Sequence, residues 1–284
     1  MATNRVSPKA MRRAGLHNVA EQQFFEDYVR DIWRRREFAV AVPLGQLRAQ
    51  HMNTLLGNLW HVLNPLLIMG VYYVLFGVIL GTSRGIPHFL AFLAVGVFVF
   101  HYTQRTVSTG ASSVFGNSGL IRAIYFPRAI LPLQTVIGQT IAFLPAIVTM
   151  LVVTLLNGVL PRPAWLFLIP LFVVQALFNL GATFVVARIG DSYRDLTNVL
   201  PHFFRILIYM SGAMYSVDRF ITSPIMRRLF ELNPMYSFIS LARGAVLGTP
   251  TTIGMYLSVT AWTLVLLIGG FIYFRAGEHA YGRA

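Results

Sequence analysis

Four long stretches without a charged side chain constrain this sequence more than any other feature. Residues 85–104, 129–161, 163–187 and 244–274 contain no Asp, Glu, Lys or Arg. Each is long enough to cross a bilayer core of about 30 Å, which takes about 20 residues at 1.5 Å per residue. Only 12% of the 284 residues are charged, about half the share found in an ordinary soluble domain. We therefore expect an all-α integral membrane protein.

The distribution of apolar residues predicts six transmembrane helices. We place them at residues 62–80, 88–104, 130–157, 165–187, 199–217 and 251–274. The segment 218–250 is too apolar for an ordinary loop and too short for two further spans, so we expect two short re-entrant outer helices there, at residues 225–232 and 235–247. Such helices are tolerated in a membrane only where protein or water satisfies their exposed backbone groups.

The basic residues predict the orientation of these spans. With both termini in the cytoplasm, 17 of the 23 basic residues fall in cytoplasmic segments, as expected because short cytoplasmic loops are enriched in Lys and Arg. No secretory signal is visible in residues 1–48, which hold nine basic and five acidic residues. We predict a cytoplasmic amino-terminal region, 1–48, followed by a transmembrane domain, 49–284, in the plasma (inner) membrane.

Residues 21–38 predict an amphipathic helix. Phe24, Tyr28 and Ile32 lie four positions apart and form an apolar stripe with their neighbours, while three consecutive arginines border it. A stripe of this kind fits a helix lying in the membrane interface; the alternative is a soluble helix packed on a partner. The net charge of +13 points to anionic lipid rather than nucleic acid, because the basic residues are not grouped with base-stacking aromatics.

Several energy sources are excluded by the residue types present. The only lysine is Lys9, preceded by Pro8, so the chain lacks the Gly-Lys-Ser/Thr of a P-loop ATPase. All ten acidic residues lie outside the predicted spans, which disfavours transport driven by an intramembrane carboxylate. Cysteine is absent, and the spans contain no pair of His or Glu at metal-ligand spacing. The energy for transport would then come from another polypeptide, unless the chain is a passive subunit.

A membrane-embedded acyl- or glycosyltransferase is a further alternative. Such an enzyme needs a carboxylate or histidine constellation at the interface, and Asp191 and Asp195 are the only candidates. We interpret both instead as partners of Arg188 and Arg194 that stabilise the end of a helix.

Four segments resemble one known family. They are 56–66 with Gly57, Trp60 and Pro65, 117–132, 193–196 with Arg194 and Asp195, and 232–235 with Asn233 and Pro234, followed by Arg243 and Gly248. Together they are similar to type-2 ABC exporter permeases of the polysaccharide class, the O-antigen and teichoic acid group often called Wzm-like. The chain departs from this pattern at residues 211–215, where Ser-Gly-Ala-Met-Tyr stands in place of Ser-Pro-Val-x-Tyr. The proline that would break the fifth span is therefore missing.

The resemblance implies a transport subunit that is not itself an enzyme. Two copies of the chain would form one pathway, each bound to a nucleotide-binding subunit that carries ATP and Mg. Residues 117–128 would be the coupling segment, because Gly119 and Pro127 bracket a short helix that can fill a cleft on a soluble partner; an ordinary interfacial loop is the alternative. The predicted coupling residues are Asn117, Leu120, Ile121, Arg122, Tyr125, Phe126, Pro127 and Arg128.

The cargo implied by the resemblance is a glycan linked to a polyprenyl diphosphate lipid. Its diphosphate would need basic residues, for which the candidates are Arg34, Arg35, Arg36 and Arg48. The alternative role of these arginines is to anchor the chain to anionic lipid. Aromatic faces suit sugars, so the candidate channel-lining residues are Tyr72, Phe76, Phe98 and Tyr102.

The basic residues are 22 Arg and one Lys, which fits a GC-rich genome. The overall pattern is similar to permeases that export lipid-linked galactan in mycobacteria and their relatives. The main rival is a type-2 ABC permease for small hydrophobic drugs or lipids, which would share the fold and the partner.

Overall fold

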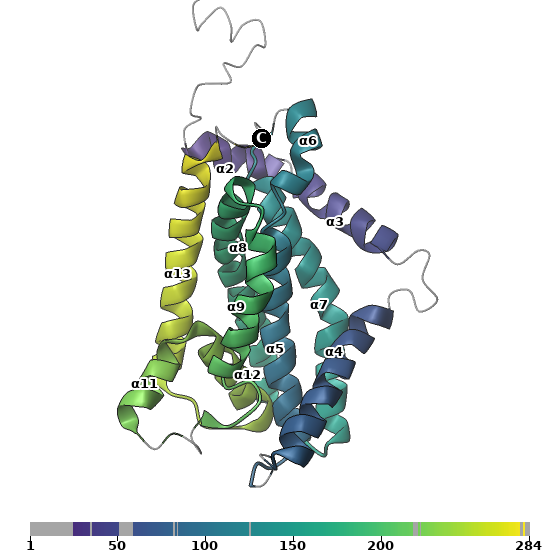
Figure 1. The fold of residues 1–284 in the computed structure, drawn as a ribbon, viewed down its shortest axis with the longest axis vertical. Coiled ribbons are helices and arrows are strands. Elements are labelled where there is room, and N and C mark those ends of the chain that lie inside the picture. Colours follow the sequence, from purple (N-terminus) through teal and green to yellow (C-terminus); the bar gives the residue numbers. More distant parts are fainter. Residues whose placement is uncertain are drawn as a thin grey trace, which may run out of the picture. The chain divides into compact units, whose positions relative to one another are not determined.

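The computed structural model describes residues 25–34, 36–50, 59–81, 83, 85–124, 126–217, 221, 223–278 and 281. The chain divides into two compact units, Met1–Arg36 and Glu37–Ala284, and each is described by itself. Within the described residues every regular element is helical and no strand occurs (Figure 1). The predicted all-α class is therefore confirmed.

The first unit contains one described helix, α2 (Phe25–Arg34). It lies inside the segment 21–38 that the sequence predicts to be amphipathic and helical. Its position in a membrane interface stays a prediction.

The second unit begins with α3 (Arg36–Gln50), which the sequence does not predict because Pro43 and Gly45 interrupt the segment. Pro43 is nonetheless buried inside the helix. It lies against Gly138 of α7 (Ile130–Leu156), where an added Cβ atom would come within 3.0 Å of the Pro43 Cβ. Packing against a neighbouring helix thus outweighs the low helix propensity of these residues.

Five helices among the described residues are long and apolar enough to cross a bilayer. They confirm the first, second, third, fourth and sixth predicted spans. They are α4 (Trp60–Tyr72) with the π-helix η2 (Tyr73–Ile79), α5 (Phe89–Gly110), α7, the 3-10 helix η4 (Pro163–Phe167) with α8 (Leu168–Ser192), and α13 (Ile253–Ala276).

The fifth predicted span is shorter than expected. Its helix, α9 (Leu196–Met210), has 15 residues, or about 22 Å at the α-helical rise. The chain leaves the helix at Ser211 and Gly212, and Gly212 has φ +62°, a left-handed conformation that glycine adopts readily. A glycine therefore ends this helix, at the position where the resembled pattern Ser-Pro-Val-x-Tyr would place a proline. The count of six spans stays a prediction.

Two short helices follow α9, as the sequence predicts for the outer segment. They are α11 (Pro224–Leu232) and α12 (Pro234–Leu247). Asn233 caps α12, because its Oδ1 accepts from the backbone N–H of Met235 at 3.0 Å. The Asn233 amide also donates to the Met210 carbonyl at 3.0 Å, so this residue joins the end of α9 to the start of α12. Pro234 occupies the first helical turn, where its missing N–H costs nothing.

A buried arginine connects α12 to the core. Arg243 is 4% exposed, and its guanidinium donates to the carbonyls of Phe92 at 3.2 Å, Gly212 at 2.9 Å and Ala213 at 2.6 Å. Its Cζ also lies 3.3 Å from the centroid of the Phe92 ring. Arg243 therefore ties α12 to α5 and to the turn that ends α9.

Helix α5 lies at the centre of the second unit and contacts α4, α7, α8, α9 and α12. The close approach of α8 and α13 depends on small residues, as is usual between membrane helices. An added Cβ at Gly181 of α8 would meet the backbone of Leu266 and Leu267 in α13. The α8–α13 pair is therefore packed backbone against backbone.

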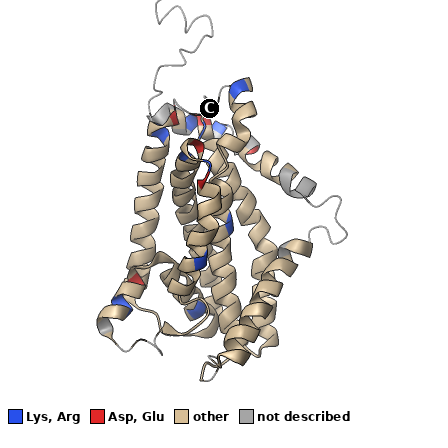
Figure 2. Ribbon diagram, viewed as in Figure 1, with Lys and Arg blue, Asp and Glu red and all other residues tan. Residues whose placement is uncertain are grey.

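Charged residues are concentrated near α6 (Ser118–Ala123) and around α11, which lie at opposite ends of the bundle (Figures 1 and 2). Arg105 and Arg205 are exceptions, since each is the single charged residue of its helix, α5 and α9 respectively. The predicted second span ended at residue 104, before Arg105, and that boundary is wrong because the helix continues. Helix α5 continues to Gly110 because polar residues remain helical there: the Thr106 hydroxyl donates to the Tyr102 carbonyl at 2.7 Å.

Candidate transport groove and coupling segment

The predicted coupling segment joins α5 to α7 and has a buried root and an exposed tip. The predicted residues, 117–128, lie in a connection that comprises the 3-10 helix η3 (Phe115–Asn117), α6 and the stretch up to Ala129. Phe126 is 4% exposed and Pro127 is buried, whereas Arg122 and Ile124 are exposed. The apolar side of α6, Leu120 and Ile121, is half-buried. The segment thus presents a short helix that a soluble protein can reach.

Two of the predicted coupling residues need separate comment. Asn117 stabilises the turn before α6, because its amide donates to the Ser113 carbonyl at 2.8 Å. Tyr125 lies outside the described residues. The contact of this segment with a nucleotide-binding subunit stays a prediction.

Two carboxyl-terminal residues, Glu278 and Tyr281, hold Arg128 at the root of the coupling segment, and we call these three residues the tail clasp. The backbone N–H of Arg128 donates to Oε1 of Glu278 at 2.9 Å, and its guanidinium donates to the Glu278 carbonyl. The Arg128 Cζ lies 6.0 Å from the Tyr281 ring centroid, and the Tyr281 hydroxyl donates to the Phe274 carbonyl at 2.7 Å. Burial raises the pKa of Tyr281, so this phenol stays protonated and remains a donor.

The tail clasp changes the interpretation of Arg128. The sequence suggested that this arginine offers a polar contact to a partner protein, but its guanidinium is engaged within the chain. Glu278 and Tyr281 were missed, because Glu278 lies 150 positions away in sequence and no local pattern joins the two segments.

Asp191 has Arg128 and Arg194 as charged neighbours, so the predicted pairing of Asp191 and Asp195 with Arg188 and Arg194 stays a prediction. Arg188 instead donates to the carbonyl of Tyr273 in α13 and lies 4.0 Å over its ring. Arg194 lies near Asp191, and it also lies 6.0 Å from the Phe115 ring centroid. Within the described residues no group of three or more His, Cys, Asp or Glu can hold a metal ion.

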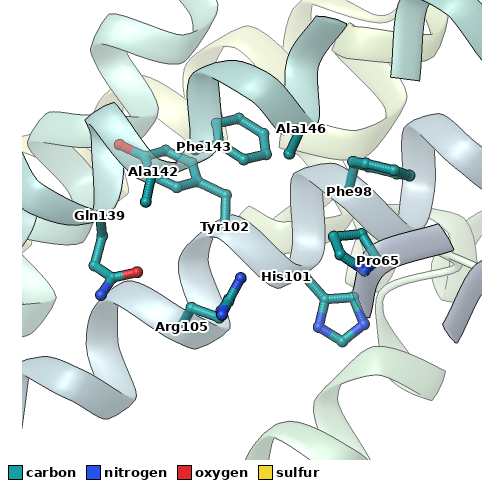
Figure 3. Close-up of a pocket in the computed structure, with 9 residues that line it drawn as sticks. All are labelled: Pro65, Phe98, His101, Tyr102, Arg105, Gln139, Ala142, Phe143 and Ala146. Carbon is teal, nitrogen blue, oxygen red and sulfur yellow. The ribbon is translucent and has the colours of Figure 1, made fainter. Parts of the chain in front are cut away.

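A groove runs between α4, α5, α7 and α9 in the second unit. It consists of two adjoining cavities. The first is lined by Pro65, Phe98, His101, Tyr102, Arg105, Gln139, Ala142, Phe143 and Ala146 (Figure 3). The second is lined by Asn64, Pro65, Ile68, His101, Gln104, Arg105, Ser108, Thr109, Gln139 and Pro201.

The first cavity is mainly aromatic. The rings of Tyr102 and Phe143 stack with centroids 4.4 Å apart and an angle of 7°, and the Tyr102 hydroxyl shares a 2.7 Å hydrogen bond with Thr140. Phe98 borders the same space. Two of the four candidate channel-lining residues, Phe98 and Tyr102, therefore line the groove. The other two, Tyr72 and Phe76, contact each other edge to face at 6.4 Å and are not among its lining residues.

The second cavity has mostly polar lining residues and lies beside the coupling segment. Ser108 and Thr109 line it and belong to the last turn of α5, directly before the chain continues toward η3 and α6. The sequence missed Arg105 and Gln139 as lining residues. Arg105 interrupts an apolar helix, and that interruption was the available signal, but it was interpreted as the end of the span.

The remaining predicted residues fall in several places. Arg34 is exposed in α2, Arg35 lies outside the described residues, and Arg36 and Arg48 fall within the bounds of α3. The structure does not place Arg34 relative to α3, so a diphosphate site shared by these arginines stays a prediction. Trp60 begins α4 and Pro65 lines the groove, whereas Gly57 lies outside the described residues.

These features define a membrane-embedded transport subunit: a bundle of apolar helices, a groove with a polar end, and a short exposed helix between two of the groove-lining helices. The chain belongs to the ABC-2 type transporter family, whose model matches residues 45–247.

Named relatives are similar over most of the chain. An O-antigen export system permease protein RfbA of Myxococcus xanthus is 28% identical over 214 residues, 75% of this chain and 81% of the relative. A protein of the same name from Klebsiella pneumoniae is 26% identical over 64% of this chain and 70% of its own length. The polysialic acid transport protein KpsM of Escherichia coli is 23% identical over 84% of this chain and 93% of the relative. These names agree with a transport subunit rather than an enzyme.

Proposed function

We propose that this chain is the permease of an ATP-driven exporter that moves a glycan linked to a polyprenyl diphosphate across the plasma membrane. One observation carries the proposal: α5 and α7 flank the exposed α6, and the same two helices line the groove. A nucleotide-binding subunit that grips α6 would therefore move two walls of the groove as rigid bodies. The relatives named for O-antigen export and polysialic acid transport support a glycan as the cargo.

The proposed assembly has two copies of this chain and two nucleotide-binding subunits, with ATP and Mg on the latter and both termini in the cytoplasm. An exposed apolar face on α4 and η2 supports the pairing of two copies: Val71 of α4 is 64% exposed, and Val78 and Ile79 of η2 are 65% and 68% exposed. The particular glycan we propose is a galactan, for which the support is the resemblance of the whole sequence to galactan-exporting permeases.

A depletion experiment tests the function. Loss of this chain from its native host should cause the lipid-linked glycan to accumulate on the cytoplasmic leaflet, measured by extraction and labelling of accessible sugar. Sensitivity to small hydrophobic compounds, measured in parallel, should not change. If that sensitivity rises while glycan export continues normally, the permease serves drugs or lipids instead.

The amino-terminal helix separates the same two functions. Deletion of residues 21–38 should reduce glycan export, because a long cargo anchored by a charged headgroup needs a basic site at the membrane surface. Unchanged export would favour the rival permease for small hydrophobic compounds.

The coupling segment is tested with variants of its tip and root. Replacing residues 119–124 by a Gly-Ser linker should abolish copurification of the nucleotide-binding subunit, because it removes the accessible helix. Phe126→Ala alters the buried root and should leave binding in place while lowering export per ATP hydrolysed. Glu278→Ala should act in the same direction but less strongly, since Arg128 loses one acceptor. If the subunit still binds after the tip is replaced, α6 is not the docking helix.

A further inference from the structure

Arg105 is the only charged residue among the described residues that line the groove, apart from the titratable His101. It lies sixteen positions after the start of α5 at Phe89, which is about 24 Å along the helix. A charged side chain at such a position in an apolar helix is costly, so it is normally directed to a water-filled cavity or to a functional partner. The structure directs Arg105 to the groove.

The Arg105 side chain has no hydrogen bond or ion pair with another described residue, and it is exposed. None of the residues lining either cavity is acidic. Arginine cannot give up its charge in a protein, and its guanidinium offers five N–H donors in a plane. The positive charge of Arg105 is therefore available for an anionic ligand.

Neutral polar groups surround this charge. Figure 3 shows Arg105 between Gln139 and His101. The Gln139 amide reaches the Thr109 hydroxyl only at 3.5 Å, the outer limit for a hydrogen bond. Nε2 of His101 is buried and has no hydrogen-bond partner among the described residues. Buried polar atoms are normally satisfied, so this nitrogen leaves hydrogen-bonding capacity unused at a residue that lines both cavities.

We propose that Arg105, His101, Gln104 and Gln139 form a subsite for the phosphate oxygens of the cargo's diphosphate, a proposal that rests on the proposed function. Charge-assisted bonds from a planar guanidinium suit phosphate, and a diphosphate has enough oxygens to accept from several neutral donors at once. The polar cavity leaves about 1170 Å³ of empty space, part of it open to solvent, which is sufficient for a headgroup and an attached sugar.

The subsite consists of other residues than the arginines of α2 and α3. Arg105 belongs to α5 and Gln139 to α7, the two helices that flank α6. Phosphate at Arg105 could come from the cargo or from a bulk anionic phospholipid, and the experiment separates these sources.

The test uses the permease purified together with its nucleotide-binding subunit in phosphatidylcholine nanodiscs. Binding of undecaprenyl diphosphate is measured by native mass spectrometry, with undecaprenol and phosphatidylglycerol as competitors. Arg105→Gln should weaken binding about tenfold, because it removes a charged donor, whereas Arg105→Lys should retain most of it. Arg205→Gln is the matched control, because Arg205 also lies within a helix but does not line the groove, and it should bind like the wild type.

Two results overturn the proposal. One is an unchanged affinity in Arg105→Gln. The other is equal competition by phosphatidylglycerol, which would make the groove a site for bulk lipid. If Arg105→Gln does not copurify with the ATPase, Gln139→Leu is tested in its place. We expect this variant to bind undecaprenyl diphosphate about threefold more weakly, and an unchanged affinity would again overturn the proposal.

Failure of the subsite and failure of the proposed function give different results. If Arg105→Gln binds normally while depletion of the chain still stops glycan export, only the subsite is wrong. If the wild-type complex binds no undecaprenyl diphosphate and depletion leaves glycan export unchanged, both are wrong.

Discussion

Helices α5 and α4 are both apolar enough to span a bilayer, but they are packed very differently. In the most apolar stretch of α5, 78% of the residues are buried within the chain. In the corresponding stretch of α4 and η2, only 17% of the residues are buried. Hydropathy is higher for the α4 segment, at 2.1 against 1.2. The more apolar helix is thus the more peripheral one, because in a membrane apolar side chains gain nothing by leaving lipid for protein.

The buried helix carries buried polar side chains. Thr103 and Thr106 of α5 are 2% and 0% exposed, and Thr103 accepts a 2.9 Å hydrogen bond from Gln175 of α8. Polar contacts and close approach hold α5 in place, so it serves as the scaffold. Helix α4 keeps an apolar face that lipid or a second copy of the chain must cover.

The largest predicted effect comes from Arg243, which ties α5 to α12. Arg243→Ala would leave three buried carbonyls without their charged donor, so we expect a loss of about 3 kcal/mol or more of stability. Thermal unfolding in detergent measures this. Arg243→Lys should recover only part of the loss, because one ammonium cannot copy the planar guanidinium. A wild-type melting temperature in Arg243→Ala would refute the role of α5 as an anchored scaffold.

The second-largest loss of stability is expected at Gly96 of α5, which lies beside Arg243. An added Cβ at Gly96 of α5 would meet the Ala213 carbonyl and the Arg243 side chain, so Gly96→Ala should destabilise by about 1–3 kcal/mol through overpacking. Gly45→Ala is the control, because nothing lies within 4 Å of the position. Equal melting temperatures of the two variants would contradict the close packing described around α5.

A smaller effect is expected for the hydrogen bonds between α5 and α8. Gln175 is fully buried, and its amide donates to the Val99 carbonyl and the Thr103 hydroxyl, both at 2.9 Å. Gln175→Leu should cost about 0.6–1.7 kcal/mol, the range measured for hydrogen bonds between membrane helices. Chemical unfolding with and without a Thr103→Val partner change isolates the pair. Full additivity of the two losses would mean that the bond contributes nothing.

The smallest effect on the single chain is expected on η2, the continuation of α4. Val78→Cys should change the stability by less than about 0.5 kcal/mol, because Val78 is 65% exposed. The chain has no other cysteine, so this variant also reports on the exposed face. Oxidative crosslinking of two copies through Val78→Cys would assign that face to the proposed dimer, and labelling by a lipid-soluble thiol reagent alone would assign it to lipid.

Sequence reasoning located the spans because uncharged runs of this length have few alternative structures. The same reasoning predicted α11, α12 and the break at Asn233 and Pro234, since Asn and Pro act locally as a cap and a first-turn residue. It failed where tertiary contacts decide whether a helix continues or ends. Pro43 sits inside α3 because Gly138 leaves room for it, and α9 ends at Gly212 without a proline.

The groove was only half predicted for a related reason. Periodicity placed Phe98 and Tyr102 on one helix face, and both line it. It could not show that Gln139 of α7 and Pro201 of α9 face the same space, because that depends on how separate helices pack. A charged residue was a misleading sign of the end of the second span, since Arg105 lies within a helix that water or a ligand can reach.

The clasp around Arg128 also constrains the order of events during biosynthesis. Glu278 leaves the ribosome 150 residues after Arg128, which corresponds to about 8–30 s at 5–20 residues per second. Until Glu278 is made, the connection between the second and third spans lacks its hydrogen bonds with this residue. Both spans are already available for insertion by that time. A nascent chain stalled before Glu278 would therefore offer the ATPase an unbraced docking helix, and productive assembly would begin only after that glutamate is made.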